Sequence, residues 1–243
     1  MKKQVVVIGL GRFGSSVAQE LYQMGHDVLA IDPEENNVQE VLGHVTYAVK
    51  ADATSEAVLR ELGVSNYDVG VVAIGTDVQA SILTTVLLKD MSISYIVVRA
   101  INELHGNAVE RLGADKVVYP EQEMGHRLAH IGFEAGVLDY MEIAPNYGIT
   151  KLRPPDQIVK KTLEEAGLAG PRDKYGIAVL AVRRGRECFL VPSKDEDIRP
   201  GDIHVVAGNS EQLSKIHIYR RQNSQKASPD EMELDPSDSI DAD

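Results

Sequence analysis

A glycine-rich loop near the N-terminus has the residue types and the spacing that bind phosphate groups. Gly9, Gly11 and Gly14 form a GxGxxG motif directly after the apolar residues 5–8. Gly9 permits a tight turn, Gly11 lets backbone N–H groups approach a pyrophosphate, and Gly14 lets a helix pack closely on a strand. The phosphates would then meet the positive end of that helix. The motif in this context predicts a nucleotide site.

Two charged side chains suit the same nucleotide. Asp32 ends the second apolar run, roughly twenty residues beyond the glycines, where a carboxylate accepts hydrogen bonds from both ribose hydroxyls. This carboxylate would repel a 2′-phosphate, which disfavours NADP. Arg12 lies inside the glycine loop, and a guanidinium binds phosphate oxygens in a fork. The alternative for Arg12 is a solvated loop arginine.

Further polar groups follow the third and fourth predicted strands. The carboxyl ends of parallel strands meet at one edge of a sheet, where open α/β sheets bind ligands. We therefore expect at least one carboxylate of these groups to contact the nucleotide, although each could instead cap the helix that follows it. The two groups are Asp52-Ala53-Thr54 and Gly75-Thr76-Asp77.

The first 120 residues must supply the sheet that holds these groups. Short β-branched runs alternate there with helical patterns, which is typical of βαβ units and a parallel sheet buried on both faces. We predict strands at residues 4–8, 28–31, 46–49, 69–73, 95–98 and 116–119, and a first helix at 13–24. The expected fold class is α/β, a Rossmann-like doubly wound parallel sheet over residues 1–120.

The pattern changes after residue 120. We predict a connecting helix within 121–136 and a small α+β domain over 137–219. In that domain we expect a strand at 137–143, a short helix at 157–166, a hairpin of 176–182 with 187–191, and a strand at 204–207. The acidic, apolar-poor residues 220–243 are expected to be disordered.

Composition narrows the function classes. The formal net charge is −12 and the sequence pI is about 5.0. This acidity argues against binding to nucleic acid or to anionic lipid, because proteins bind both through clustered Lys and Arg. A single cysteine, Cys188, excludes an internal disulfide and fits a reducing compartment. We find no secretory signal and no apolar run of the ~20 residues that a membrane helix needs. A cytoplasmic protein is expected, with any membrane contact made through a partner.

These motifs together resemble the KTN/RCK regulators of potassium channels and transporters, in particular their soluble Ktr/Trk-type subunits. The resemblance covers nearly everything before the acidic tail, and the spacing of several motifs agrees. The residues that carry it are Gly9-Leu10-Gly11-Arg12-Phe13-Gly14, Asp32, Ala51-Asp52-Ala53-Thr54, Arg99-Ala100, Leu112-Gly113-Ala114-Asp115 and Val118-Tyr119-Pro120-Glu121.

The resemblance implies a site for ATP or ADP, with a cation near the phosphates at Glu121. From the residues alone, Glu121 could instead place favourable negative charge in the first turn of a helix. The candidate nucleotide-binding residues are Gly9, Gly11, Arg12, Phe13, Gly14, Asp32, Asp52, Ala53, Thr54, Gly75, Asp77 and Arg99.

The resemblance also implies partners. The subunits are expected to pair, to assemble into a ring, typically of eight chains, and to act on a separate membrane pore protein. Some relatives bind a cyclic dinucleotide between paired C-terminal domains. In the corresponding hairpin here, Arg183, Arg184 and Arg186 could face phosphates, but Val191 stands where a polar residue is expected, which disfavours this second ligand.

Two other functions are compatible with the same predicted fold. An NAD-dependent oxidoreductase would use the same glycine loop and Asp32, but no Tyr-Lys or His-carboxylate constellation is evident to move a proton, so we expect no enzyme activity. An NADH-sensing repressor would need a DNA-binding segment. His126 and His130 are four residues apart and could bind a metal, but they lack the Glu of an HExxH motif, and surface histidines are the favoured reading.

Overall fold

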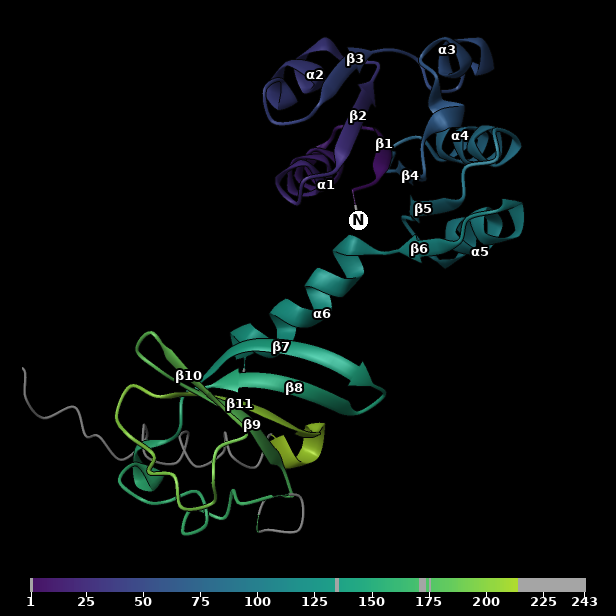
Figure 1. Ribbon diagram of the computed structural model, residues 1–243. Helices are drawn as coiled ribbons and strands as arrows, with labels where there is room; N and C mark the ends of the chain where they lie inside the picture. The colour runs from purple at the N-terminus through teal and green to yellow at the C-terminus, as the bar shows by residue number, and fades with distance from the viewer. Residues whose placement is uncertain (1, 134–135, 171–173, 175, 214–243) are drawn as a thin grey trace, which may run out of the picture. The chain divides into compact units, whose positions relative to one another are not determined.

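The computed structural model describes residues 2–133, 136–170, 174 and 176–213 (Figure 1). The chain forms two compact units, Met1–Met124 and Gly125–Asp243, and each is described by itself. The predicted disordered tail, 220–243, lies outside the described residues. The predicted domain boundaries at residues 120, 136 and 219 stay predictions.

The first unit contains a parallel six-stranded sheet with the strand order β3-β2-β1-β4-β5-β6. This order reverses between β1 and β4, as in a doubly wound Rossmann sheet, and the expected fold class is confirmed. The strands are β1 (Gln4–Ile8), β2 (Asp27–Asp32), β3 (Tyr47–Lys50), β4 (Val69–Val72), β5 (Tyr95–Arg99) and β6 (Lys116–Val118). The helices are α1 (Arg12–Gln23), α2 (Glu35–Val41), α3 (Glu56–Glu61), α4 (Val78–Asp90), α5 (Glu103–Leu112) and the 3₁₀ helix η1 (Val64–Asn66).

Each face of this sheet has its own apolar core, because successive side chains of a strand point to opposite faces. On β1, Val5 and Val7 join the core that also holds Ala18 of α1. Val6 and Ile8 join the other core, which contains side chains of α3, α4 and α5. A strand buried on both faces must be apolar at every position, which explains the unbroken run at residues 5–8.

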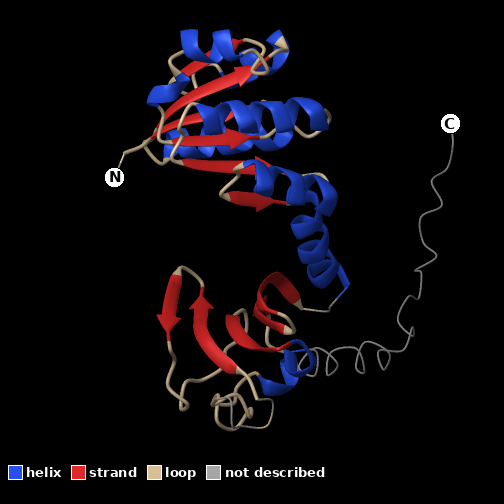
Figure 2. Cartoon of the chain, turned by 90° about the vertical axis from the view of Figure 1, so that its right-hand side faces the viewer, coloured by secondary structure: helices blue, strands red, loops and turns tan. Residues whose placement is uncertain are grey.

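The second unit is built on a five-stranded sheet whose neighbouring strands are all antiparallel (Figure 2). Its order is β10-β9-β11-β8-β7. The strands are β7 (Val137–Ala144), β8 (Tyr147–Leu152), β9 (Ala178–Arg184), β10 (Glu187–Leu190) and β11 (Ile203–Asn209). Of these, β8 was not predicted from the sequence. The predicted hairpin left residues 183–186 as its turn, but Arg183 and Arg184 belong to β9.

The predicted helix at 157–166 is wrong. Only the 3₁₀ helix η2 (Asp156–Ile158) forms there, and the chain then runs beside residues 194–198. The Leu163 N–H donates to the carbonyl of Glu196 at 3.0 Å, and Lys160 has a φ of 70°, which no right-handed helix accommodates. Leu163 and Ile198 are both buried in the core of this unit. Long-range pairing and burial therefore override the local helical pattern.

Helix α6 (Pro120–Phe133) begins one residue before the predicted start, while residues 134–135 lie outside the description. Across residues 2–133 and the later described segments, every helix is too short or too polar to cross a membrane.

Candidate nucleotide-binding site

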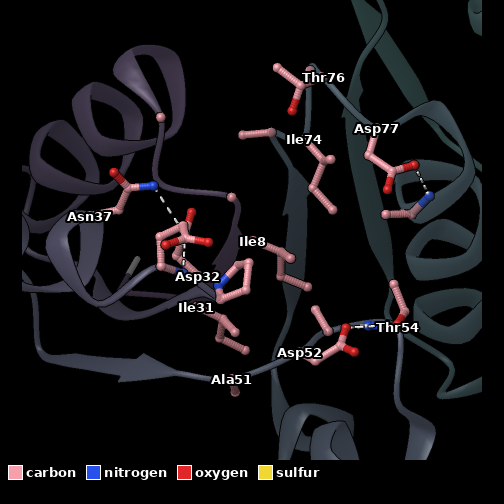
Figure 3. A pocket seen from close by; sticks show the side chains of 18 of the residues that line it. Ile8, Ile31, Asp32, Asn37, Ala51, Asp52, Thr54, Ile74, Thr76 and Asp77 are labelled. Carbon is pink, nitrogen blue, oxygen red and sulfur yellow. Dashed lines mark hydrogen bonds between the residues drawn. The ribbon is translucent and has the colours of Figure 1, made fainter.

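A pocket of about 630 Å³ opens at the carboxyl edge of the parallel sheet. Its lining comes from the ends of β1, β2 and β5, from the segments after β1, β2, β3 and β4, and from one residue each of α2 and α4 (Figure 3). The volume lies in the range that small-molecule ligands occupy in proteins. The pocket spans the position between β1 and β4 where the strand order reverses, and this is where open α/β sheets bind ligands.

The glycine loop has the backbone geometry that its sequence predicts. Gly9 has a φ of +91°, in the left-handed region that favours glycine. A Cβ on Gly14 would lie 1.8 Å from the carbonyl oxygen of Gly9, so no larger residue fits between α1 and the loop. Gly11 is the N-cap of α1, and a Cβ there would meet nothing within 4 Å. The loop is therefore closed on the Gly14 side and open at Gly11.

Asp32 is buried, with 5% of its surface exposed, and lines the pocket. Its Oδ2 accepts a hydrogen bond from the Leu10 N–H at 2.6 Å. Its Oδ1 accepts one from the Glu34 N–H at 2.8 Å and another from the Asn37 amide at 3.1 Å. The carboxylate thus ties the end of β2 to the glycine loop and to α2.

The carboxylates after β3 and β4 also line the pocket. Asp77 is the N-cap of α4 and accepts from the Ala80 N–H at 2.9 Å, so the capping alternative is correct for this residue. Asp52 does not cap a helix: its Oδ1 accepts from the backbone N–H and the hydroxyl of Thr54, at 2.9 and 2.7 Å. These two hydrogen bonds hold the pKa of Asp52 below its ordinary value.

Arg99, at the end of β5, lines the pocket and carries a positive charge. A Cβ on Gly75 would lie 2.0 Å from a guanidinium nitrogen of Arg99, so the guanidinium lies against the backbone after β4. Arg99 forms an ion pair with Glu121, and its Nε is buried with no hydrogen-bond partner among the described residues. Partial burial would raise the pKa of Glu121, but hydrogen bonds from its own backbone N–H and from Arg99, with the charges of Arg99 and Arg12, lower it.

The structure brings most of the predicted residues to one pocket. Those lining it are Gly9, Gly11, Asp32, Asp52, Ala53, Thr54, Gly75, Asp77 and Arg99, whereas Arg12, Phe13, Gly14 and Glu121 do not line it. Sequence reasoning missed Asn37, which lines the pocket from α2. Its signal was weak, because nothing in the sequence shows which side chain of a short helix turns toward the preceding strand.

His126 and His130, the candidate metal ligands on the connecting helix, are not part of a metal-binding cluster among the described residues. No group of three or more His, Cys, Asp or Glu side chains within the described ranges could hold a metal ion. His130 stacks on Tyr140 at a ring-centroid distance of 3.9 Å, and His126 lies 3.6 Å from a carboxylate oxygen of Glu142. Both histidines therefore have contacts within the second unit.

Arg184, one of the hairpin arginines, is engaged inside the second unit. Its guanidinium donates to both carboxylate oxygens of Asp202 at 3.0 Å and to Glu196 at 3.0 Å. The side chain of Asp202 is 0% exposed. Arg184 is therefore held by carboxylates of its own unit, whereas Arg183 and Arg186 are exposed.

The fold and the pocket define a two-part α/β protein whose first unit is a Rossmann-type ligand-binding module. Residues 5–120 match the TrkA-N domain, and residues 151–219 match the TrkA-C domain. The Ktr system potassium uptake protein C of Bacillus subtilis is 39% identical over 216 residues, covering 89% of this chain and 96% of that protein. The chain belongs to this TrkA-N/TrkA-C family of Ktr potassium uptake proteins.

Other relatives agree. The Ktr system potassium uptake protein A of Bacillus subtilis is 38% identical, over 88% of this chain and 95% of that protein, and its namesake from Vibrio alginolyticus is 34% identical, over 87% and 95%. The RCK domain of GsuK superposes with a TM-score of 0.61 at 16% identity, over 90% of this chain and 47% of that chain. This chain thus spans about half of the GsuK chain, and the likeness shows a shared fold.

Proposed function

We propose that this chain is a regulatory subunit of a potassium uptake system, and that the pocket of its first unit binds ATP or ADP. The main observation in favour of a nucleotide is that the open glycine loop at Gly11 and the buried carboxylate of Asp32 line the same pocket. Three curated relatives covered over at least 95% of their length are named as Ktr potassium uptake proteins, which supports the transport role.

An anionic ligand is supported by the polar groups that face the pocket. The Arg99 Nε is a buried donor without a partner in the described part of the chain, and an unpaired buried donor costs about 1–3 kcal/mol. Gly11 leaves the first turn of α1 accessible, and backbone N–H groups there bind phosphate. In this proposal Arg12, Phe13 and the loop glycines surround the phosphates, and Asp32 holds the ribose.

The role in this proposal is sensing rather than catalysis. Carboxylates are the only general acids or bases in the described lining of the pocket. Three of them, Asp32, Asp52 and Asp77, accept hydrogen bonds from backbone N–H groups of the protein. NAD stays the second candidate ligand, because a GsuK channel structure of the same fold, with a TM-score of 0.59, has NAD bound. ATP, ADP, NAD and NADH therefore all belong in the first experiment.

A cation at Glu121 is part of the proposal. The carboxylate is 66% exposed, next to the pocket residue Arg99, and its pKa is lowered, so it is ionised near neutral pH. An ionised, accessible carboxylate near nucleotide phosphates suits a hard cation that also contacts phosphate oxygens. Further ligands would come from the nucleotide or from a second copy of the chain.

Regulation requires partners. By the family resemblance, the chains pair, assemble into a ring of eight, and act from the cytoplasmic side on a separate membrane pore protein. ATP and ADP must then have different affinities for two shapes of the ring, since a ligand that binds both equally shifts nothing. A coupling of ~1–3 kcal/mol per site is ordinary for allostery.

We propose no cyclic dinucleotide as a second ligand, because Arg184 is held by Asp202.

The test is calorimetric titration of the full chain with ATP, ADP, NAD and NADH. We expect ATP and ADP to bind at least about tenfold tighter than the dinucleotides, a difference of about 1.4 kcal/mol. Asp32→Ala and Arg12→Ala should weaken ATP binding, while Asp90→Ala and Arg111→Ala, at exposed helix ends, should not. Tighter binding of NADH by the same factor would reject the adenine-nucleotide proposal. Light scattering with and without ATP measures the assembly.

A further inference from the structure

Asp32 has little hydrogen-bonding capacity left for a ribose. A carboxylate oxygen has about two acceptor sites. Oδ1 already accepts from the Glu34 N–H at 2.8 Å and from the Asn37 amide at 3.1 Å, whereas Oδ2 accepts only from the Leu10 N–H at 2.6 Å among the described residues. One acceptor site therefore remains, on Oδ2. Two ribose hydroxyls cannot both bind Asp32 unless one of these donors leaves.

Asn37 is the side-chain donor to Asp32 and lines the pocket beside it. It is half-buried in α2, it lines the pocket, and its side chain points to Asp32 (Figure 3). The Leu10 and Glu34 donors are backbone groups held by the fold, so of the three donors Asn37 alone can rotate. Its amide carries a second N–H and a carbonyl oxygen in addition to the N–H given to Asp32. A hydroxyl can donate to that oxygen or accept from that N–H.

We propose that ribose recognition in this chain is divided between two residues: one hydroxyl of the ribose binds Asp32 Oδ2, and the other binds the Asn37 amide. Asn37 is thereby a specificity-determining residue for ribonucleotides. The inference rests on the proposed nucleotide function and adds a ligand contact to it. It also replaces the sequence-based expectation that both hydroxyls donate to Asp32.

The division predicts different losses for analogues that lack one hydroxyl. A ligand without a hydroxyl leaves a polar group of the site unpaired, which weakens binding. We expect 2′-deoxy-ATP and 3′-deoxy-ATP each to bind the wild-type chain about threefold to tenfold more weakly than ATP, the range of one hydrogen bond. The Asn37→Ala variant should bind one of the two deoxy analogues with an affinity within about twofold of its affinity for ATP. The other analogue should still bind more weakly than ATP.

The experiment is a set of calorimetric titrations with ATP and the two deoxy analogues on wild type, Asn37→Ala, Asn37→Gln and Asn36→Ala. Asn36 is the matched control, because it is the same residue type, exposed, and outside the pocket lining. Asn36→Ala should keep both penalties, and Asn37→Gln, which retains an amide, should restore part of the lost one. Thermal unfolding without ligand checks that all variants fold.

The outcomes separate this inference from the proposed function. If ATP does not bind the wild-type chain, the proposed function fails. If ATP binds and Asn37→Ala keeps both penalties, Asn37 contacts neither hydroxyl and only this inference is rejected. If both penalties vanish together in Asn37→Ala, Asn37 acts only by orienting Asp32, and the divided recognition is also rejected.

Discussion

Arg99 and Glu121 form an ion pair although 22 residues separate them in the chain. Arg99 ends β5 and lines the pocket, whereas Glu121 lies in the first turn of α6. The Arg99 side chain is 20% exposed and that of Glu121 is 66% exposed, so the arginine is the anchored partner. The pair therefore links the charge of the pocket to a carboxylate that solvent and cations can reach.

Substitution of Arg99 should weaken ATP binding, whereas substitution of Glu121 should strengthen it. Arg99→Ala removes a charged donor, which contributes about 1.5–3 kcal/mol, so ATP should bind roughly tenfold more weakly or worse. Glu121→Gln removes a competing negative charge, worth about 0.2–1 kcal/mol at an exposed site, so ATP should bind up to about fivefold tighter in EDTA. Calorimetry on both variants measures this, with Arg111→Ala as the control. Weaker ATP binding by Glu121→Gln in EDTA would contradict the assigned charges.

Two glycines of the same loop should respond differently to alanine. A Cβ on Gly14 would lie 1.8 Å from the Gly9 carbonyl oxygen, so Gly14→Ala should destabilise the first unit by about 3 kcal/mol, the upper range for overpacking. A Cβ on Gly11 meets no atom within 4 Å, so Gly11→Ala should fold normally and lose only nucleotide affinity. Chemical denaturation and ATP titration distinguish the two. Equal loss of stability in both variants would refute the assignment.

The second unit should depend strongly on Arg184. Arg184→Ala leaves the carboxylate of Asp202, which is 0% exposed, without its ion pair. Breaking a buried pair on one side costs about 3–5 kcal/mol. Arg183→Ala, one residue earlier in β9 and exposed, should change the free energy of unfolding by less than about 0.5 kcal/mol. Urea unfolding of both variants tests this, and similar losses would mean that the Asp202 pair is not structural.

Acid should weaken the second unit through His204. Burial lowers its pKa to about 4, opposed by the charge of Asp202 and aided by that of Arg184. Both ring nitrogens are buried and unpaired within the described residues. The unfolded chain, with a histidine pKa of about 6.5, binds the proton first, so stability is complete above pH 6.5 and falls toward pH 4.

The size of this effect is about 3 kcal/mol between those pH values, from the difference between the two pKa values. His204→Leu removes the titrating group, so the variant should lose less stability than the wild type over the same range. Urea unfolding at half-unit pH steps measures both curves. Parallel curves for the two proteins would exclude His204 as the source.

Much of the first unit could be predicted, because its determinants are local. The strand at residues 4–8 was predicted with its observed bounds, and the other five strand predictions overlap observed strands. Strands buried on both faces are apolar at every position, and this signal survives without tertiary information. In the second unit the helix predicted at 157–166 is wrong, because residues 160–164 pair with residues 194–198, which are distant in sequence.

The sequence by itself determined the parallel sheet, the glycine loop and the presence of Asp32 at its edge, since strand period and turn chemistry are encoded in neighbouring residues. Only the tertiary structure decided which side chains meet. It brought Arg99 to Gly75 and Glu121, and Asn37 to Asp32. It also buried Asp202 under Arg184. Such contacts join separate elements, and the hydrogen-bonding capacity left for a ligand depends on them.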